Sequence, residues 1–195
     1  LQLKGKTALV TGASQGIGRA IARGLAAEGV KICIAARRKN LLEELEQEIV
    51  AAGGIRPVIV ETDIMQEDAP ARLACAALDG LAHIDILVNC AGGSRPPLAI
   101  DAPEAEWDFA MTLNFVRVRQ VTHAVLPGMI EHQWGRIINI TGKSEPARLI
   151  AATPAKAAVH AWSKGLSREV GKFGITVNCI PPGRIMSEQI ERKYS

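Results

Sequence analysis

The strongest constraint on the fold is a regular alternation between short apolar segments and longer amphipathic ones. Each short segment ends in a polar or glycine-containing turn, and each longer one has apolar residues at helical spacing. The segments predicted as strands are residues 7–10, 30–35, 58–60, 84–88, 137–140 and 175–180. The segments predicted as helices are residues 17–28, 40–52, 66–81, 104–126 and 154–172. This alternation predicts an α/β fold with a parallel sheet and helices on both of its faces.

Local signals refine two of these helices. Asn40 and Glu43 form a capping pair at the start of the second helix, and Gly53-Gly54 ends it. The long helix 104–126 is expected to break near Pro127-Gly128. We find no repeat, linker or low-complexity tract, so residues 1–195 are predicted to form a single domain.

Composition excludes several classes of protein. The chain is 48% hydrophobic and 22% charged, which is typical of a globular protein. No apolar run reaches the ~18 residues of a membrane span, and residues 1–6 show no secretory signal. A net charge of +3 and 4% aromatic residues do not favour nucleic-acid binding. The four cysteines are scattered without a Cys-x-x-Cys pair, which indicates no metal site and favours reduced thiols in the cytoplasm.

A glycine-rich turn, TGASQGIG (residues 11–18), lies between the first strand and the first helix. In a doubly wound sheet this turn binds a pyrophosphate, because glycines bring the backbone close and the helix N-terminus offers free N–H groups. The spacing is Gly-x-x-x-Gly-x-Gly, which departs from the general dinucleotide fingerprint, and a plain tight turn is the alternative interpretation. The predicted cofactor-binding residues here are Gly12, Ser14, Gln15, Gly16, Ile17 and Gly18.

Further motifs follow in a recognisable order. They are VNCAGG (residues 88–93), Asn114 in the long helix, INIT (138–141), Lys156 and VNCIPPG (177–183). With the glycine turn, they make nearly the whole chain resemble the short-chain dehydrogenase/reductase family, and 3-oxoacyl-acyl-carrier-protein reductases in particular. The resemblance implies a Rossmann-type sheet of order 3-2-1-4-5-6. It also implies hydride transfer between a nicotinamide and a ketone or secondary alcohol, with 3-oxoacyl thioesters as one substrate class.

The end of the second strand indicates which nicotinamide is bound. An NAD site needs an acidic residue there, whereas NADP needs a cation. This chain has Ala36 followed by Arg37, Arg38 and Lys39. A solvated basic cluster is the alternative, but cations before a helix oppose its dipole, and an anionic ligand would resolve that conflict. The sequence therefore favours NADP(H) over NAD(H), with Arg37 and Arg38 as phosphate ligands.

The resemblance also assigns the rest of the cofactor site. It implies that Asp63 and Ile64 contact the adenine, and that Lys156 binds the nicotinamide ribose. The loop after the fourth strand is expected to line the adenine-ribose side through Asn89, Ala91 and Gly92. The nicotinamide is expected to approach Pro182, Gly183 and Ser187.

The catalytic positions depart from the family pattern. Lys156 and Asn114 match the family's lysine and asparagine, but Ala152 stands where the proton-donating tyrosine is expected and Gly142 where the serine is. Ser144 is the substitute hydroxyl we assign. The other candidate acids are Thr141, Thr153, Lys143 and Lys156 itself, and neither His123, His160 nor Tyr194 is assigned a role. Three interpretations stay open: an enzyme with a substitute acid, a catalytically impaired cofactor-binding or sensing module, and different chemistry on the same fold.

Two expectations concern the surface of the molecule. Residues 184–195 resemble the start of a substrate lid that is then cut off, so the domain is expected to lack the lid and last strand of the family and to expose strand 175–180. The family resemblance implies a homodimer or homotetramer formed by helices 104–126 and 154–172. These helices carry apolar or small residues at Val116, Val118, Val121, Ala157, Ala158, Ala161 and Trp162.

Overall fold

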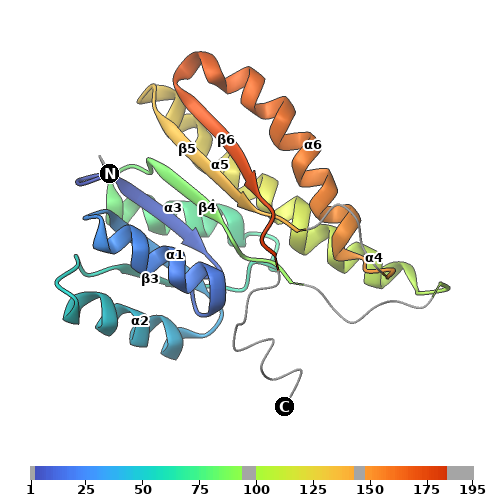
Figure 1. The fold of residues 1–195 in the computed structure, drawn as a ribbon, viewed down its shortest axis with the longest axis horizontal. Helices are drawn as coiled ribbons and strands as arrows, with labels where there is room; N and C mark the ends of the chain where they lie inside the picture. The colour runs from blue at the N-terminus through green and yellow to red at the C-terminus, as the bar shows by residue number, and fades with distance from the viewer. Residues whose placement is uncertain (1–2, 94–99, 143–147, 184–195) are drawn as a thin grey trace.

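The computed structural model describes residues 3–93, 100–142 and 148–183. Its core is one parallel sheet in the order β3-β2-β1-β4-β5-β6, as the sequence predicts (Figure 1). The strands are β1 (Thr7–Thr11), β2 (Lys31–Ala36), β3 (Val58–Glu61), β4 (Ile86–Asn89), β5 (Gly135–Ile140) and β6 (Ile175–Ile180). Each strand returns to the next through a helical crossover, which is the connection that parallel strands require.

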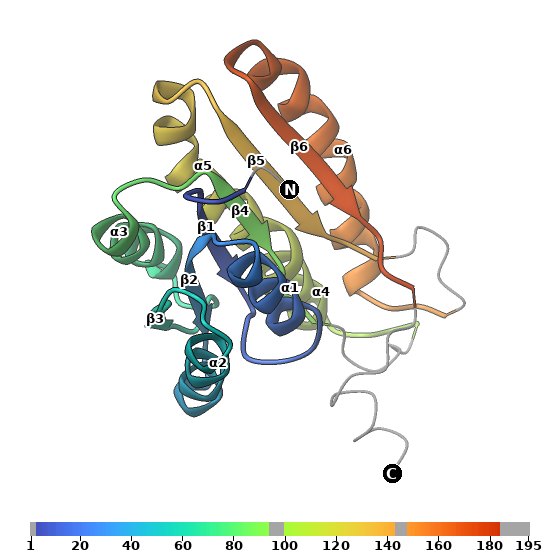
Figure 2. The same ribbon diagram turned by 60° about the vertical axis from the view of Figure 1, so that its left-hand side comes forward.

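Helices cover both faces of the sheet (Figures 1 and 2). They are α1 (Gly16–Ala27), α2 (Lys39–Ala51), α3 (Ala69–Leu81), α4 (Glu104–Met111), α5 (Arg117–Glu131) and α6 (Ala152–Val170). A π-helical turn (Thr112–Val116) joins α4 to α5, and a 3₁₀ turn (Gly171–Phe173) follows α6. Buried side chains of α3, α5 and α6 cluster on one face, and those of α1 and α2 on the other.

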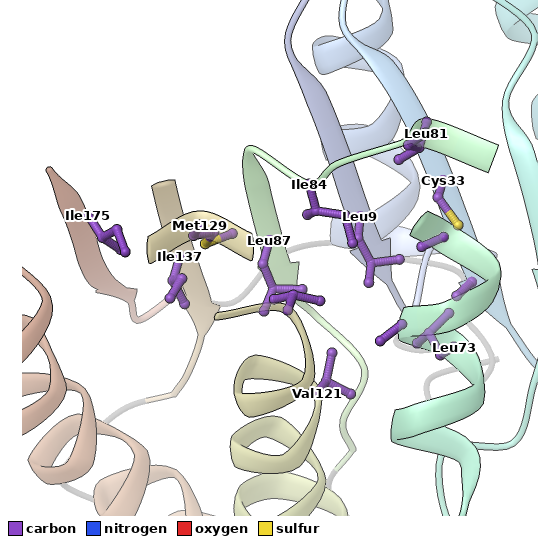
Figure 3. Close-up of a cluster of buried hydrophobic side chains, with 14 of the residues drawn as sticks. Leu9, Cys33, Leu73, Leu81, Ile84, Leu87, Val121, Met129, Ile137 and Ile175 are labelled. Carbon is purple, nitrogen blue, oxygen red and sulfur yellow. The ribbon is translucent and has the colours of Figure 1, made fainter. Parts of the chain in front are cut away.

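The larger of the two apolar clusters lies between the centre of the sheet and the α3–α5 layer. Leu9, Leu87 and Ile137, from three adjacent strands, are fully buried there and point toward the helices (Figure 3). Val121 and Met129 of α5 meet them from the opposite side. Alternation of side chains along each strand divides the apolar residues between the two faces, which is why both faces carry a core.

The strand order reverses at β1, and this reversal locates the site. β1 pairs with β2 on one side and with β4 on the other, so that Val10 lies opposite both Ile34 and Val88. The loops after β1 and β4 therefore diverge to opposite faces from neighbouring strand ends. A crevice of this kind at the carboxyl edge is the usual ligand site of an open α/β sheet.

Two local signals read from the sequence at helix ends were wrong, the capping pair at Asn40 and the break at Pro127. Helix α2 begins at Lys39 with Arg38 as its N-cap residue, so Asn40 lies inside the first turn and is exposed. Glu43 pairs with Lys39 at 3.7 Å rather than capping with Asn40. Helix α5 does not stop before Pro127 but continues to Glu131. Burial of Met129 in the core outweighs the one backbone hydrogen bond that Pro127 removes.

β6 is the last strand at its side of the described sheet. Its residues alternate between buried and exposed, and Ile180 at its end is 49% exposed. In the part of the chain that the structure describes, no helix is long and apolar enough to cross a membrane.

Candidate active site

The turn between β1 and α1 leaves no room for side chains at its two outer glycines. Gly12 has a φ of +68°, and a Cβ built on it would lie 2.8 Å from the backbone nitrogen of Ala91. A Cβ on Gly18 would collide with the carbonyl oxygen of Gly12. Helix α1 begins at Gly16, and its N-cap residue Gln15 provides no side-chain hydrogen bond to the first N–H groups. This bare main chain at a helix N-terminus is what the predicted phosphate site requires.

Thr11 ties this turn to the loop after β4. Its Oγ1 accepts hydrogen bonds from the backbone N–H groups of Cys90 and Ala91, each at 3.0 Å. The same hydroxyl donates to the carbonyl oxygen of Val88 at 3.3 Å. One buried side chain thus fixes the two loops that flank the crevice relative to each other.

The basic residues after β2 reach the glycine turn. The Nη2 of Arg38 donates a hydrogen bond to Ser14 Oγ at 3.0 Å, while Arg37 is exposed beside it. Ala36, which ends β2, has no side chain that could accept from a ribose hydroxyl. A guanidinium placed against the phosphate turn suits an additional phosphate on the cofactor.

The turn after β3 is held by its own aspartate. Asp63 Oδ1 accepts a hydrogen bond from the N–H of Met65 at 3.1 Å, and its carbonyl oxygen accepts from the N–H of Gln66 at 3.0 Å. Ile64 is half-buried against the larger apolar cluster. This turn therefore has a defined shape at the position assigned to the adenine.

Asn89 is engaged in the interior. Its side chain is 3% exposed, and Nδ2 donates to Thr122 Oγ1 at 3.0 Å and to Asn139 Oδ1 at 2.8 Å. Asn139 in turn donates to Ser163 Oγ at 2.9 Å. The Asn89 amide thus joins β4 to β5 and α5, and any cofactor contact by this residue falls to its backbone.

Asn114 and Lys156 meet at Gly92. Asn114 lies in the π-helical turn, is 1% exposed, and accepts a hydrogen bond from the Gly93 N–H through Oδ1 at 3.0 Å. Lys156 Nζ donates to the carbonyl oxygen of Ile140 at 2.8 Å. A Cβ built on Gly92 would lie 2.9 Å from Asn114 Oδ1 and 3.2 Å from Lys156 Nζ. Residues from three separate elements therefore converge on one point above the sheet.

Burial changes the acidity of two groups at this point. It lowers the pKa of Lys156 below its ordinary value of 10.5, and the nearby Cys90 opposes that shift. Burial also raises the pKa of the Cys90 thiol to about 11, although the Lys156 charge works against it. Lys156 is thus a stronger acid than an ordinary lysine. The Cys90 thiol is a weaker acid than an ordinary thiol and stays protonated near neutral pH.

Ala152 and Gly142 stand at the positions where the resemblance implies a tyrosine and a serine. Ala152 opens α6 one turn before Lys156 and is 7% exposed, and a Cβ on Gly142 would lie 3.8 Å from Lys156 Cδ. Thr141 is 4% exposed, and its Oγ1 has no hydrogen-bond partner among the described residues. The predicted residues Ser144 and Ser187, together with Lys143 and Tyr194, lie outside the residues that the structure describes.

The remaining sequence candidates lie in the segment after β6 and on α5. Pro182 is half-buried and Gly183 exposed in the segment after β6, and the carbonyl oxygen of Ile180 accepts a hydrogen bond from Thr141 N at 2.9 Å. His123 is exposed on α5 beside the ring of Trp162.

Sequence reasoning missed Arg117. It is 9% exposed and donates to the carbonyl oxygen of Met65 at 2.8 Å, beside the Asp63 turn. An arginine between two valines in a helix is more typical of a solvated face, so no sequence signal marks it.

The strand order and the glycine turn define a Rossmann-like α/β domain with a half-buried lysine at its carboxyl edge. A family model described as short chain dehydrogenase matches residues 6–194. A 3-oxoacyl-[acyl-carrier-protein] reductase of Synechocystis is 36% identical over 196 residues, covering 97% of this chain and 78% of that protein. A short chain dehydrogenase of Pseudocercospora fijiensis is 36% identical over 96% of this chain, which spans 62% of that protein's length. The chain belongs to the short-chain dehydrogenase family, whose members use nicotinamide cofactors.

Solved structures give the same result. Pseudomonas aeruginosa RhlG in complex with NADP is 33% identical and superposes with a TM-score of 0.88, covering 97% of this chain and 77% of that one. L-sorbose reductase from Gluconobacter frateurii, complexed with NADPH and L-sorbose, is 30% identical with a TM-score of 0.92, covering 97% and 73%. Both similarities extend over nearly all of this chain.

Proposed function

We propose that this protein is an NADP(H)-dependent oxidoreductase that transfers a hydride between the nicotinamide and a ketone or secondary alcohol, with 3-oxoacyl thioesters as a substrate class. The observation that carries the proposal is the convergence of Lys156 and Asn114 on Gly92 at the carboxyl edge of the sheet. The family supports the reaction type, and similarity to a 3-oxoacyl-[acyl-carrier-protein] reductase supports the substrate class.

The cofactor's diphosphate would lie on the turn 12–18, and its additional phosphate beside Arg37 and Arg38, because these groups offer bare N–H donors and cations. Bound there, the nicotinamide supplies or accepts the hydride. The other residues assigned to the cofactor are Asp63, Ile64, Asn89, Ala91, Gly92, Lys156, Pro182, Gly183 and Ser187.

Reduction of a carbonyl also requires a proton at its oxygen. We assign that proton to the Lys156 ammonium, directly or through a water, because burial lowers its pKa and makes it a stronger acid than an ordinary lysine. The Ile140 carbonyl orients the ammonium, and Asn114 fixes the loop at Gly93 beneath it. Ser144 and Thr141 are the hydroxyls that would replace Lys156 in this role.

One observation favours a second function. Ala152 places a methyl group where the family's tyrosine is expected, and nothing ionisable replaces it within the described part of α6 upstream of Lys156. A chain that keeps Lys156 for the ribose but lacks an effective acid would be a catalytically impaired NADP(H)-binding or sensing module.

Turnover distinguishes the two functions. NADPH oxidation is measured at saturating cofactor against a panel of ketones and 3-oxoacyl thioesters, for the parent, Lys156→Met and Ala152→Tyr. Turnover by the parent that is lost in Lys156→Met, while NADPH still binds, supports the enzyme. Tight NADPH binding without turnover, and activity gained only in Ala152→Tyr, supports the binding module.

Cofactor preference is tested by titration with NADPH and NADH. Arg37→Ala and Arg38→Ala are each expected to weaken NADPH binding by about tenfold and to leave NADH binding nearly unchanged. Lys39→Ala is the control, because Lys39 is exposed and pairs with Glu43. Equal affinities for the two cofactors, unaltered by either arginine substitution, would contradict the preference.

A homo-oligomer formed through α5 and α6 is also proposed. Val118 and Val121 face the core, whereas Ala157 and Ala161 are exposed on α6 and Trp162 is half-buried. The exposed small residues would let a second copy approach closely. Sedimentation that shows a stable monomer at micromolar concentration would rule this out.

A further inference from the structure

Arg117 is a buried cation that the proposed reaction does not use. It is the first residue of α5, directly after the π-helical turn, and is 9% exposed. Its Nη1 donates to Gln120 Oε1 at 2.6 Å, and its Nη2 donates to the carbonyl oxygen of Met65 at 2.8 Å. Among the described residues its Nε has no partner.

The carbonyl that Arg117 holds belongs to the turn after β3. Within this turn Asp63 accepts hydrogen bonds from the backbone N–H groups of Met65 and Gln66. At its start, Thr62 N donates to the carbonyl oxygen of Ala36 at 2.9 Å, which fixes the turn to the end of β2. The turn 63–66 is therefore anchored to the sheet at one side and to α5, through Arg117, at the other.

We propose that Arg117 is a positioning residue for the adenine half of the cofactor, because it holds the turn 63–66 at the carboxyl edge of the sheet. This inference rests on the proposed function. A dinucleotide crosses the carboxyl ends of the strands at the reversal of strand order, with its diphosphate on the turn after β1. Because β2 and β3 lie on the same side of that turn as Arg38, their carboxyl ends border the half that carries the adenosine.

Packing alone does not account for a charge at this position. A buried guanidinium whose Nε–H has no acceptor among residues 3–93, 100–142 and 148–183 carries a desolvation penalty that an apolar side chain of similar volume avoids. A residue that served only stability would be better replaced by methionine. What methionine cannot do is donate to the Met65 carbonyl, and that contact spans 52 positions of sequence.

The same helical segment also carries Asn114, which the proposed function assigns to the catalytic site. Asn114 lies three residues before Arg117 in the π-helical turn and accepts a hydrogen bond from Gly93. One continuous helical segment therefore contacts both the turn 63–66 and the loop at Gly93. A displacement at the adenine end would reach Asn114 through this segment.

The experiment measures two ligands by calorimetry: NADPH, and adenosine 2′,5′-bisphosphate, which contains only the adenine half. Arg117→Met is expected to raise both dissociation constants by the same factor, about tenfold, because the lost contact is a charge-assisted hydrogen bond on the adenine side. Arg117→Lys keeps the charge and is expected to recover part of the affinity. Arg119→Met, a half-buried arginine of the same helix, is the matched control and is expected to leave both constants unchanged.

Hydrogen exchange provides a readout that does not depend on the cofactor. The backbone amides of Met65 and Gln66 are expected to exchange faster in Arg117→Met than in Arg119→Met, while β4 stays protected. If Arg117→Met does not fold, Gln120→Met removes the group that orients the guanidinium and is expected to produce a smaller effect of the same kind.

The outcomes separate the two proposals. If the parent binds neither ligand, the proposed function fails, and the exchange rates at 65 and 66 still decide whether Arg117 holds the turn. If NADPH binding weakens in Arg117→Met but adenosine 2′,5′-bisphosphate binding does not, the effect lies at the nicotinamide end and the positioning role is overturned. Unchanged affinities and unchanged exchange would overturn it as well.

Discussion

Gly12 and Gly92 stand where a methyl group would strike parts of the site that come from other elements. At Gly12 the obstacle is the backbone of Ala91, and at Gly92 it is the side chains of Asn114 and Lys156. A backbone obstacle cannot rotate away, whereas the end of a lysine side chain can. The two glycines therefore differ in what a substitution would cost.

Gly12→Ala is expected to lower the free energy of unfolding by roughly 1–3 kcal/mol, because φ is +68° and the new methyl would meet the Ala91 nitrogen at 2.8 Å. Urea denaturation measures the change. Gly24→Ala is the control, since Gly24 is exposed inside α1 with nothing within 4 Å of its Cβ position. That substitution is expected to stabilise by about 0.5–1 kcal/mol. Changes of the same sign at both positions would contradict the argument.

Lys156 gives a prediction for pH. Because burial lowers its pKa in the folded state below 10.5, the unfolded chain binds this proton more readily than the folded chain. The contribution of Lys156 to the free energy of unfolding therefore rises with pH through the window that ends near 10.5. Urea denaturation at increasing pH should show a steeper rise for the parent than for Lys156→Met. Lys164→Met, at an exposed position of α6, should keep the slope of the parent. Parallel curves for Lys156→Met and the parent would show that burial does not shift this group.

Sequence motifs singled out Asn114 and Lys156, but the sequence did not predict which hydrogen bonds other polar residues near them make. The sequence assigned Asn89 to the cofactor side, and the structure shows its amide committed to Thr122 and Asn139 inside the protein. Arg117 left no signal because its partner lies 52 positions away. A contact between distant loops depends on the assembled sheet, which local patterns do not encode.

At the scale of elements, a buried polar chain joins two strands to two helices. Hydrogen bonds of 2.8–3.0 Å connect four side chains one after another: Thr122 of α5, Asn89 of β4, Asn139 of β5 and Ser163 of α6. All are at most 3% exposed. A satisfied network of this kind fixes the spacing of the strand ends that carry the site.

Asn139→Leu is expected to lower the free energy of unfolding by about 1–3 kcal/mol, because it leaves buried polar groups of Asn89 and Ser163 without their partner. Asn178→Leu is the control: Asn178 is exposed on the adjacent strand β6, and its change should stay within about 0.5 kcal/mol. Denaturation of both variants tests the comparison. Equal losses would mean that the network contributes no more than a surface amide.

The long helix shows what periodicity can and cannot predict. The sequence indicated a helix over 104–126, and the structure has helical backbone there, but with a π-helical turn at Thr112–Val116. One wider turn shifts the apolar pattern too little to be noticed in a sequence. Asn114 is buried within this turn, where its Nδ2 donates to the carbonyl oxygen of Ala110 at 3.0 Å and its Oδ1 accepts from the Gly93 N–H.

For the whole molecule, the alternation of segments was sufficient to predict the architecture. The alternation predicts a parallel sheet with helices on both faces, whereas the strand order 3-2-1-4-5-6, which the structure confirms, was implied by the family resemblance. The same alternation did not predict how the loops at the carboxyl edge connect. Thr11, Arg38 and Arg117 make those connections over long sequence separations.

These connections lead to a prediction about stability as a whole. The proposed cofactor contacts the loops after β1, β2 and β3 in one half of the sheet and those after β4 and β6 in the other, so its binding opposes unfolding of both halves together. At a concentration one hundred times its dissociation constant, NADPH should raise the free energy of unfolding by about 2.7 kcal/mol. NADH at the same concentration should raise it less, because Arg38 beside Ser14 then has no additional phosphate to bind. In Arg38→Ala the difference between the two cofactors should become smaller, and the remainder should come from Arg37. Equal stabilisation of the parent by NADPH and NADH in urea denaturation would contradict a phosphate site at Arg38.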